Sequence, residues 1–172
     1  MDVFEAIRTK RAVRRFAERP LPEDATRAIL NAGRQAQSSK NSQPWQFIAI
    51  SDRATLKQLA ECGTYAGHLA GAALGVALVA PETDPEMRPW IMFDIGQAAA
   101  HMQLAAWELG IGSCIATIYE PEKAREVLGI PADHRLDVAL SFGYPAADVQ
   151  LDRPPRPGGR RSYDEVVHQN RW

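Results

Sequence analysis

The chain has few of the residues that crosslink a protein or hold a metal ion. It contains two cysteines, Cys62 and Cys114, which lie far apart and form no CxxC pair. Two thiols cannot staple a chain of 172 residues, so we expect a reducing compartment, the cytoplasm, rather than a disulfide scaffold. The four histidines do not cluster at the spacing of metal ligands, and we therefore expect no bound metal.

Long apolar runs are also missing. The longest, residues 69–81, contains glycines and is too short to cross a bilayer. The first ten residues, MDVFEAIRTK, lack the apolar core of a signal peptide, so we expect no membrane partner. The sequence has no GxGxxG after a strand, no GxxxxGKS/T and no GxSxG. These absences argue against the usual nucleotide cradles and against an α/β-hydrolase nucleophile.

Positive charge is concentrated at the two ends of the chain. Residues 1–15 and residues 153–172 each hold five basic and two acidic residues, a net charge of +3, whereas residues 16–152 have a net charge of −7. This distribution predicts a local anion site where the ends meet, not a broad surface for nucleic acid. A solvated charged face is the alternative for residues 8–15, because most runs of charge lie at the surface.

Length and composition fit one domain spanning residues 1–172. Apolar periodicity, capping residues and breakers predict helices at 2–9, 22–35, 52–61, 91–109 and 121–129, and strands at 46–50, 73–80, 113–117 and 136–142. We expect residues 10–16 to be extended and residues 163–172 to form a last turn or strand. The irregular order of helices and strands predicts an α+β fold. Glycines recur every four residues between 63 and 75, which we attribute to close backbone packing.

Four segments carry the functional signal. They are KRAVRRF at 10–16, SSKNSQPWQF at 38–47, AAWELGIGSCIAT at 105–117 and GRRSYDEVVHQNRW at 159–172. Each is weak alone, but their order and spacing together resemble the FMN-dependent nitroreductase family. The resemblance covers nearly the whole chain, from VFEAIRTKRAVRRF to VVHQNRW.

The resemblance implies an architecture and an activity. The implied fold is nitroreductase-like, with a central mixed, mostly antiparallel sheet flanked by helices and a C-terminal tail that extends onto a partner subunit. The implied assembly is a homodimer with FMN at the interface. The implied reaction takes hydride from NADH or NADPH at flavin N5 and passes the electrons to a small acceptor such as a nitroaromatic or a quinone. No acid–base side chain is required, because the flavin performs the difficult step.

The family pattern Arg-x-Ser-x-Arg/Lys falls on Lys10, Ala12 and Arg14. Lys10 keeps the positive charge but lacks the bidentate fork of arginine, and Ala12 lacks the serine hydroxyl. Arg11 or the backbone is expected to offset part of that loss. By the resemblance, Arg14 reaches the flavin edge at N1 and O2, where a cation favours the reduced form.

The remaining candidate residues come from the other three segments. We expect Arg160 and Arg161 to bind the FMN phosphate, joined by Lys10 or Arg11, because a near-dianion prefers charge-assisted donors. The resemblance implies that Ile115 and Ala116 pack on the ring and that the backbone N–H near Thr117 donates to N5. Polar residues of the 38–47 loop would reach the flavin of the partner subunit; these are Ser38, Ser39 and Asn41.

Two alternatives remain open. One is a flavin-binding protein for storage or redox sensing, without nicotinamide turnover. The other is a relative with specialised flavin chemistry, such as dehalogenation, dehydrogenation or breakdown of another flavin. Loop 81–90, with Trp90 as a lid or a dimer contact, and the surroundings of Tyr65 and Tyr119 would decide the acceptor, but they contain no motif.

Overall fold

The computed structural model describes residues 1–151 and 159–172. Arg153 and Arg156, which contribute to the basic C-terminal end, lie outside the described residues. The helices are α1 (Val3–Thr9), α2 (Glu23–Arg34), α3 (Arg53–Ala60), α4 (Arg88–Glu108), α5 (Pro121–Leu128) and α6 (Tyr163–Val166), with 3₁₀ turns η1 (Ser39–Asn41) and η2 (Gly67–Gly71). The strands are β1 (Gln46–Ile50), β2 (Leu74–Pro81), β3 (Gly112–Thr117) and β4 (His134–Gly143).

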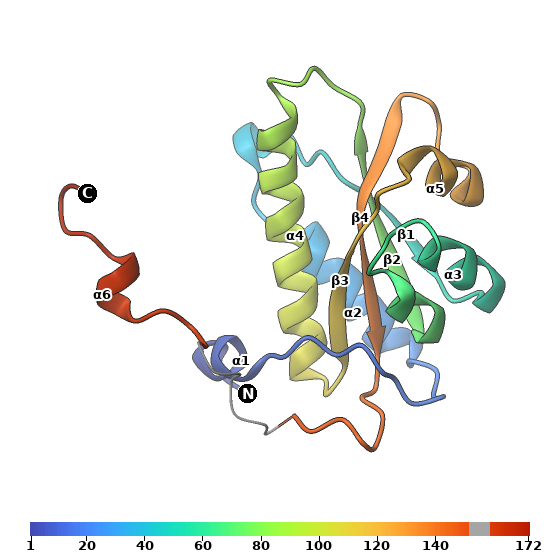
Figure 1. The fold of residues 1–172 in the computed structure, drawn as a ribbon, viewed down its shortest axis with the longest axis horizontal. Helices are drawn as coiled ribbons and strands as arrows, with labels where there is room; N and C mark the ends of the chain where they lie inside the picture. The colour runs from blue at the N-terminus through green and yellow to red at the C-terminus, as the bar shows by residue number, and fades with distance from the viewer. Residues whose placement is uncertain (152–158) are drawn as a thin grey trace.

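One four-stranded sheet, in the order β1-β2-β4-β3, organises the molecule, and all its ladders are antiparallel. The predicted α+β class is therefore confirmed. Helices α2 and α4 cover one face of the sheet, and α3, α5 and η2 cover the other (Figure 1). The side chains of β2 alternate between the two faces, which explains why this strand is apolar without interruption.

Helix α4 is the longest element and begins earlier than the sequence predicted. Arg88 opens it, because Pro89 suits the first helical turn, and Gly110, at φ +71°, follows its end. Its inner side is buried against the sheet and α2. Its outer side exposes Phe93 and Ala100 to solvent.

The N-terminal segment runs along the outer edge of β3. Ala12 pairs with Ser113 in a parallel bridge, and the backbone N–H of Val13 donates to the Ser113 carbonyl at 2.9 Å. This isolated parallel bridge lies outside the four strands, whose pairings with one another are all antiparallel. The indole N–H of Trp107, in the last turn of α4, donates to Thr9 Oγ1 at 2.9 Å. The segment is thus fastened both to β3 and to the C-terminal end of α4.

The C-terminal tail leaves the body beside α1, and α6 lies apart from the sheet and its covering helices (Figure 1). Ser162 and Glu165 form a capping box that starts this short helix. Tyr163, Val166 and Trp172 are all exposed. Among the described residues, no helix is both long and apolar enough to cross a membrane.

The glycines that recur every four residues between 63 and 75 pack closely at two of their four positions. A methyl group at Gly63 would meet the Thr117 carbonyl oxygen at 2.3 Å, and one at Gly75 would meet Leu56 Cδ2 at 2.6 Å. No described atom lies within 4 Å of a methyl group added at Gly67 or Gly71.

Gly112 lets the N-terminal segment approach β3, since a methyl group there would lie 2.6 Å from Val13 Cβ. We predict that Gly112→Ala lowers the free energy of unfolding by about 1–3 kcal/mol through overpacking. Gly71→Ala is the matched control, because its methyl group meets open space among the described residues. Urea denaturation measures both variants. Equal midpoints for the two would show that this contact is dispensable.

Candidate functional site

Cations from both ends of the chain converge beside β3. Lys10 follows the last residue of α1 and is half-buried. Burial lowers the pKa of Lys10 from its ordinary value, and the charge of Arg160 lowers it further, although the Cys114 thiol acts in the opposite direction. An effect of Arg160 on Lys10 requires the two cations to be close. The tail passes α1 at this point (Figure 1).

Arg14 lies in the same group. Burial raises the pKa of the Cys114 thiol, while the charges of Arg14 and Lys10 and a hydrogen bond from Arg14 lower it. Within residues 1–151 and 159–172, no carboxylate forms a salt bridge with Lys10, Arg14 or Arg160. Among the described residues, these three cations therefore have no carboxylate partner.

Three other residues that the sequence predicted for the site have different surroundings. The Arg11 guanidinium donates to the carbonyls of Arg8 and Thr9 at 3.1 and 3.2 Å, so it caps the end of α1. Ala12 is exposed at the edge of β3, where it forms the bridge to that strand. Arg161 is exposed next to Arg160. Sequence reasoning missed the capping role of Arg11, although an arginine just after a helix is a known signal for it.

Strand β3 presents free backbone groups at its outer edge. The Ser113 carbonyl points outward, because it accepts from Val13. Backbone groups of successive strand residues point to opposite edges, so those of Ile115 and Thr117, two and four residues after Ser113, point outward too. Both side chains are also exposed, that of Ile115 by 49%.

The prediction that Ala116 packs on a ring is wrong for its side chain. Ala116 is 1% exposed and belongs to the core shared with α3, η2 and α5. It lies between Ile115 and Thr117, so strand alternation turns it to the opposite face. Only its backbone is available at the site.

The 38–47 loop is anchored on α4. The Ser39 N–H donates to Asp94 Oδ2 at 3.1 Å, and the buried Asp94 also accepts from Gln97 at 3.2 Å. Ser38 Oγ accepts from the Gln43 N–H at 2.9 Å. Asn41 is one of three loop residues with positive φ, a conformation that is costly for most side chains and often marks a functional loop.

A hollow of about 720 Å³ adjoins this loop. Its walls include Ser38 and Ser39 on one side and the exposed Trp90 and Phe93 of α4 on the other. Sequence reasoning missed Asp94 as the anchor of the loop. An acidic residue in an otherwise apolar helix was the signal that could have found it.

The two groups of predicted residues lie at opposite ends of α4. The loop contacts Asp94, whereas the N-terminal segment contacts Trp107. A rise of about 1.5 Å per residue separates these two positions by roughly 20 Å along the helix. The chain therefore brings together Lys10, Arg14, Arg160 and the β3 edge, but it does not bring the loop to them.

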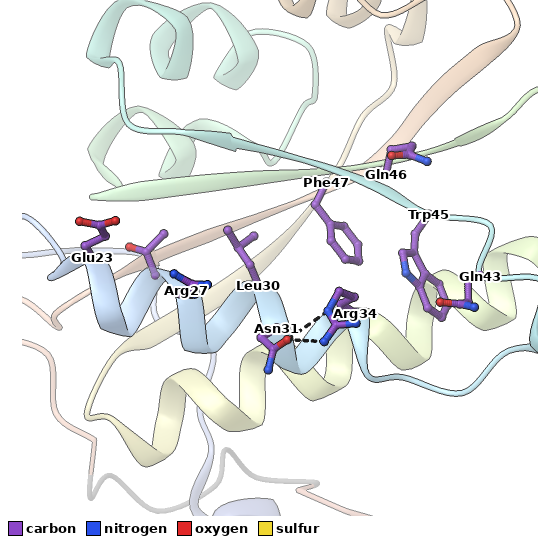
Figure 2. Close-up of a pocket in the computed structure, with 10 residues that line it drawn as sticks. Glu23, Arg27, Leu30, Asn31, Arg34, Gln43, Trp45, Gln46 and Phe47 are labelled. Atoms are coloured by element: carbon purple, nitrogen blue, oxygen red, sulfur yellow. Dashed lines mark hydrogen bonds between the residues drawn. The ribbon is translucent and has the colours of Figure 1, made fainter.

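A larger hollow, of about 920 Å³, lies between α2 and β1 and contains none of the predicted residues. Figure 2 shows Arg34 held by two hydrogen bonds to Asn31 Oδ1, at 3.1 and 2.8 Å. Trp45 and Phe47 line the same hollow with nearly parallel rings, 6.3 Å apart. Trp45 is buried and packs in the core on this face of the sheet.

Known proteins match this chain over most of its length. The model of the nitroreductase family matches residues 7–62 and 61–144. A candidate NADH dehydrogenase/NAD(P)H nitroreductase of Archaeoglobus fulgidus is 34% identical over 179 residues, which covers 99% of each chain.

Solved structures agree with the sequence match. An FMN-dependent nitroreductase from Clostridium difficile R20291 has a TM-score of 0.82 and 26% identity, over 99% of this chain and 100% of that one. Nitroreductase A from Vibrio parahaemolyticus shares the fold, with a TM-score of 0.88 and 22% identity over 100% of this chain and 77% of that one. The chain therefore belongs to the nitroreductase family of oxidoreductases.

Proposed function

We propose that this oxidoreductase binds FMN and transfers hydride from NADH or NADPH, through the flavin, to a small acceptor such as a nitroaromatic or a quinone. The observation that carries the proposal is the convergence of Lys10, Arg14 and Arg160 beside the free edge of β3. The similarity to a protein named an FMN-dependent nitroreductase supports the same cofactor.

The chemistry of the three cations fits a phosphorylated flavin. Burial is the main reason for the lowered pKa of Lys10, repulsion by Arg160 contributes to it, and a phosphate between the two cations would relieve that repulsion. Arg161 is close enough in sequence to add a further donor. The exposed position of Arg14 suits the N1 and O2 edge of the ring.

The outer edge of β3 fits the other side of the ring. The Thr117 N–H points outward and is our candidate donor to N5, and the Ile115 side chain offers an apolar surface. FMN itself would supply the hydride chemistry, so the chain has to bind and orient the reactants. The hollow at Trp90 and Phe93 provides aromatic walls suited to a flat acceptor.

A homodimer would complete the site. The loop with Ser38, Ser39 and Asn41 is bound to Asp94, roughly 20 Å along α4 from the residue that binds the N-terminal segment, so we propose that the loop serves the flavin of the partner. The exposed side of α4 contains Gly96 and Ala100, whose small side chains allow close approach of a second helix. We propose that the tail after residue 159 extends onto the partner, since its apolar residues have no cover within the described chain.

We further propose that residues 1–172 act as a single FMN-binding domain in the cytoplasm. Cys62 and Cys114 are both free and buried, which fits a reducing compartment.

We expect the purified protein to be yellow, to release FMN on denaturation and to lose its colour with NADPH or NADH. We predict that Arg14→Ala weakens FMN retention about tenfold or more, or lowers the flavin potential, because a charge-assisted contact is lost. Arg53→Ala is the control, because the guanidinium of Arg53 on α3 donates a hydrogen bond to the Ala70 carbonyl of η2, away from the cations. Absorbance spectroscopy and mass spectrometry of the cofactor provide the measurements.

Colourless protein that refuses added FMN would refute the proposed cofactor. Bound FMN that neither nicotinamide bleaches would favour a storage or sensing protein. Equal flavin content and equal potential in the two variants would remove Arg14 from the site.

The dimer is tested on the exposed side of α4. We predict that Ala100→Glu gives a monomer with less than half of the bound FMN, because two like charges would meet where the helices approach. Gln58→Glu adds the same charge on α3 and should leave the dimer intact. Light scattering gives the mass. A fully loaded Ala100→Glu dimer would mean that the partner does not pack here.

Lys10 should bind FMN at a cost to the stability of the empty protein. We predict that Lys10→Met raises the urea midpoint of FMN-free protein, because it removes a half-buried charge. The pKa of Lys10 is lower in the folded than in the unfolded chain, so this advantage is complete below the folded pKa and disappears as the pH rises to about 10.5. Excess FMN should reverse the order of midpoints. Lys57→Met, on α3, is the control, and equal effects of both variants would contradict this account.

A further inference from the structure

His68 is a buried histidine beside the outer edge of β3. It belongs to η2 and is 8% exposed. Its Nδ1 lies 2.7 Å from Ser141 Oγ on β4. Its Nε2 is buried and has no hydrogen-bond partner within residues 1–151 and 159–172. A buried polar atom of this kind requires an explanation, because an unpaired group costs stability.

The hydrogen bonds around Ser141 allow two arrangements of the ring proton. A carbonyl oxygen can only accept, and the Cys114 carbonyl oxygen lies 3.4 Å from Ser141 Oγ. The single Ser141 proton is directed either to that carbonyl, with Nδ1–H of His68 donating to Ser141 Oγ, or to Nδ1 itself, which leaves the ring proton on Nε2. In each arrangement the neutral ring has one nitrogen without a proton, and that nitrogen is the atom that a further proton would bind.

The groups around this ring come from three elements. Arg14, from the N-terminal segment, is the ionised side chain that acts on it, and Lys10 acts on the neighbouring Cys114 thiol of β3. Burial lowers the pKa of His68, and Arg14 lowers it further, whereas the Ile115 backbone raises it. The neutral ring is therefore favoured while the positive charge of Arg14 is not offset.

We propose that the imidazole ring of His68 takes up one proton when two electrons enter the flavin site, and that it releases this proton when the electrons leave. The proposal rests on the proposed function, because it places Arg14 and Ile115 at the flavin. The observations that carry it are the burial of the ring, its Nε2 without a partner among the described residues, and the hydrogen bonds that link the ring through Ser141 to the Cys114 carbonyl of β3.

The protons and electrons balance. A hydride from the nicotinamide brings two electrons and one proton, and it leaves the site one unit more negative. This charge offsets that of Arg14 and raises the pKa of His68, so the His68 ring binds a second proton from solvent. A quinone that becomes a hydroquinone takes two electrons and two protons. His68 would hold the second proton, which the nicotinamide does not supply.

The test counts protons taken up per electron pair. We expect a slope of the midpoint potential against pH that corresponds to two protons per electron pair in the wild-type holoprotein. This slope applies at pH values between the pKa of His68 in the oxidised protein and its pKa in the reduced protein. His68→Gln keeps the approximate size of the side chain and a hydrogen-bond donor for Ser141. Its midpoint potential should change with pH with the slope of one proton per electron pair. Ser141→Ala removes the hydrogen bond but leaves the His68 ring, so it should keep two protons.

Equal proton counts in wild type and His68→Gln would overturn the proposal. A loss of the second proton in Ser141→Ala as well would assign the effect to local structure and would also overturn it. If His68→Gln does not fold, nuclear magnetic resonance of the wild-type ring decides. A rise in its pKa on reduction supports the proposal, and an unchanged pKa refutes it. Protein without FMN would instead contradict the proposed function, so the two failures are distinguishable.

Discussion

The contact between Val13 and Ser113 is the constraint on which the site depends. It fixes the N-terminal segment as an extra partner of β3, and it thereby sets Lys10 and Arg14 beside Cys114. The same pairing covers only the first part of the β3 edge, which leaves Ile115 and Thr117 with free backbone groups. This short parallel bridge therefore positions the cations, and it leaves the following part of the β3 edge unpaired, where a ligand can bind.

Separation along α4 governs how the site is assembled. This helix covers one face of the sheet. It contacts the 38–47 loop through Asp94 in its first half and the N-terminal segment through Trp107 near its end. Because a helix is rigid over this length, neither group can reach the other within one chain. The proposed dimer rests on this separation, on the uncovered side of the helix and on the proposal that the loop and the cations serve the same flavin.

Local signals explain why much of the fold could be predicted from the sequence. Asp2 and Asp52 cap helices through bonds to nearby backbone N–H groups, and Gly129 ends α5 in the left-handed region, so each boundary depends on neighbouring residues. Within the candidate site, Ala116 was misjudged, because its burial depends on which face of the sheet β3 turns inward. Asp94 was missed, because its partner Ser39 lies in a distant loop. The motif residues that would bind FMN remain predictions, since their contacts lie with a ligand and a second chain.

The position of the loop at the far end of α4 has a genetic consequence. In the proposed dimer each site takes its cations from one chain and its loop from the other. Two chains that carry different lesions, one in the cations and one in the loop, would then pair to give one wholly damaged site and one intact site. Random pairing makes about half of the dimers mixed, and each mixed dimer has one intact site of two, so two inactive alleles of this kind would restore about a quarter of the activity when they are expressed together.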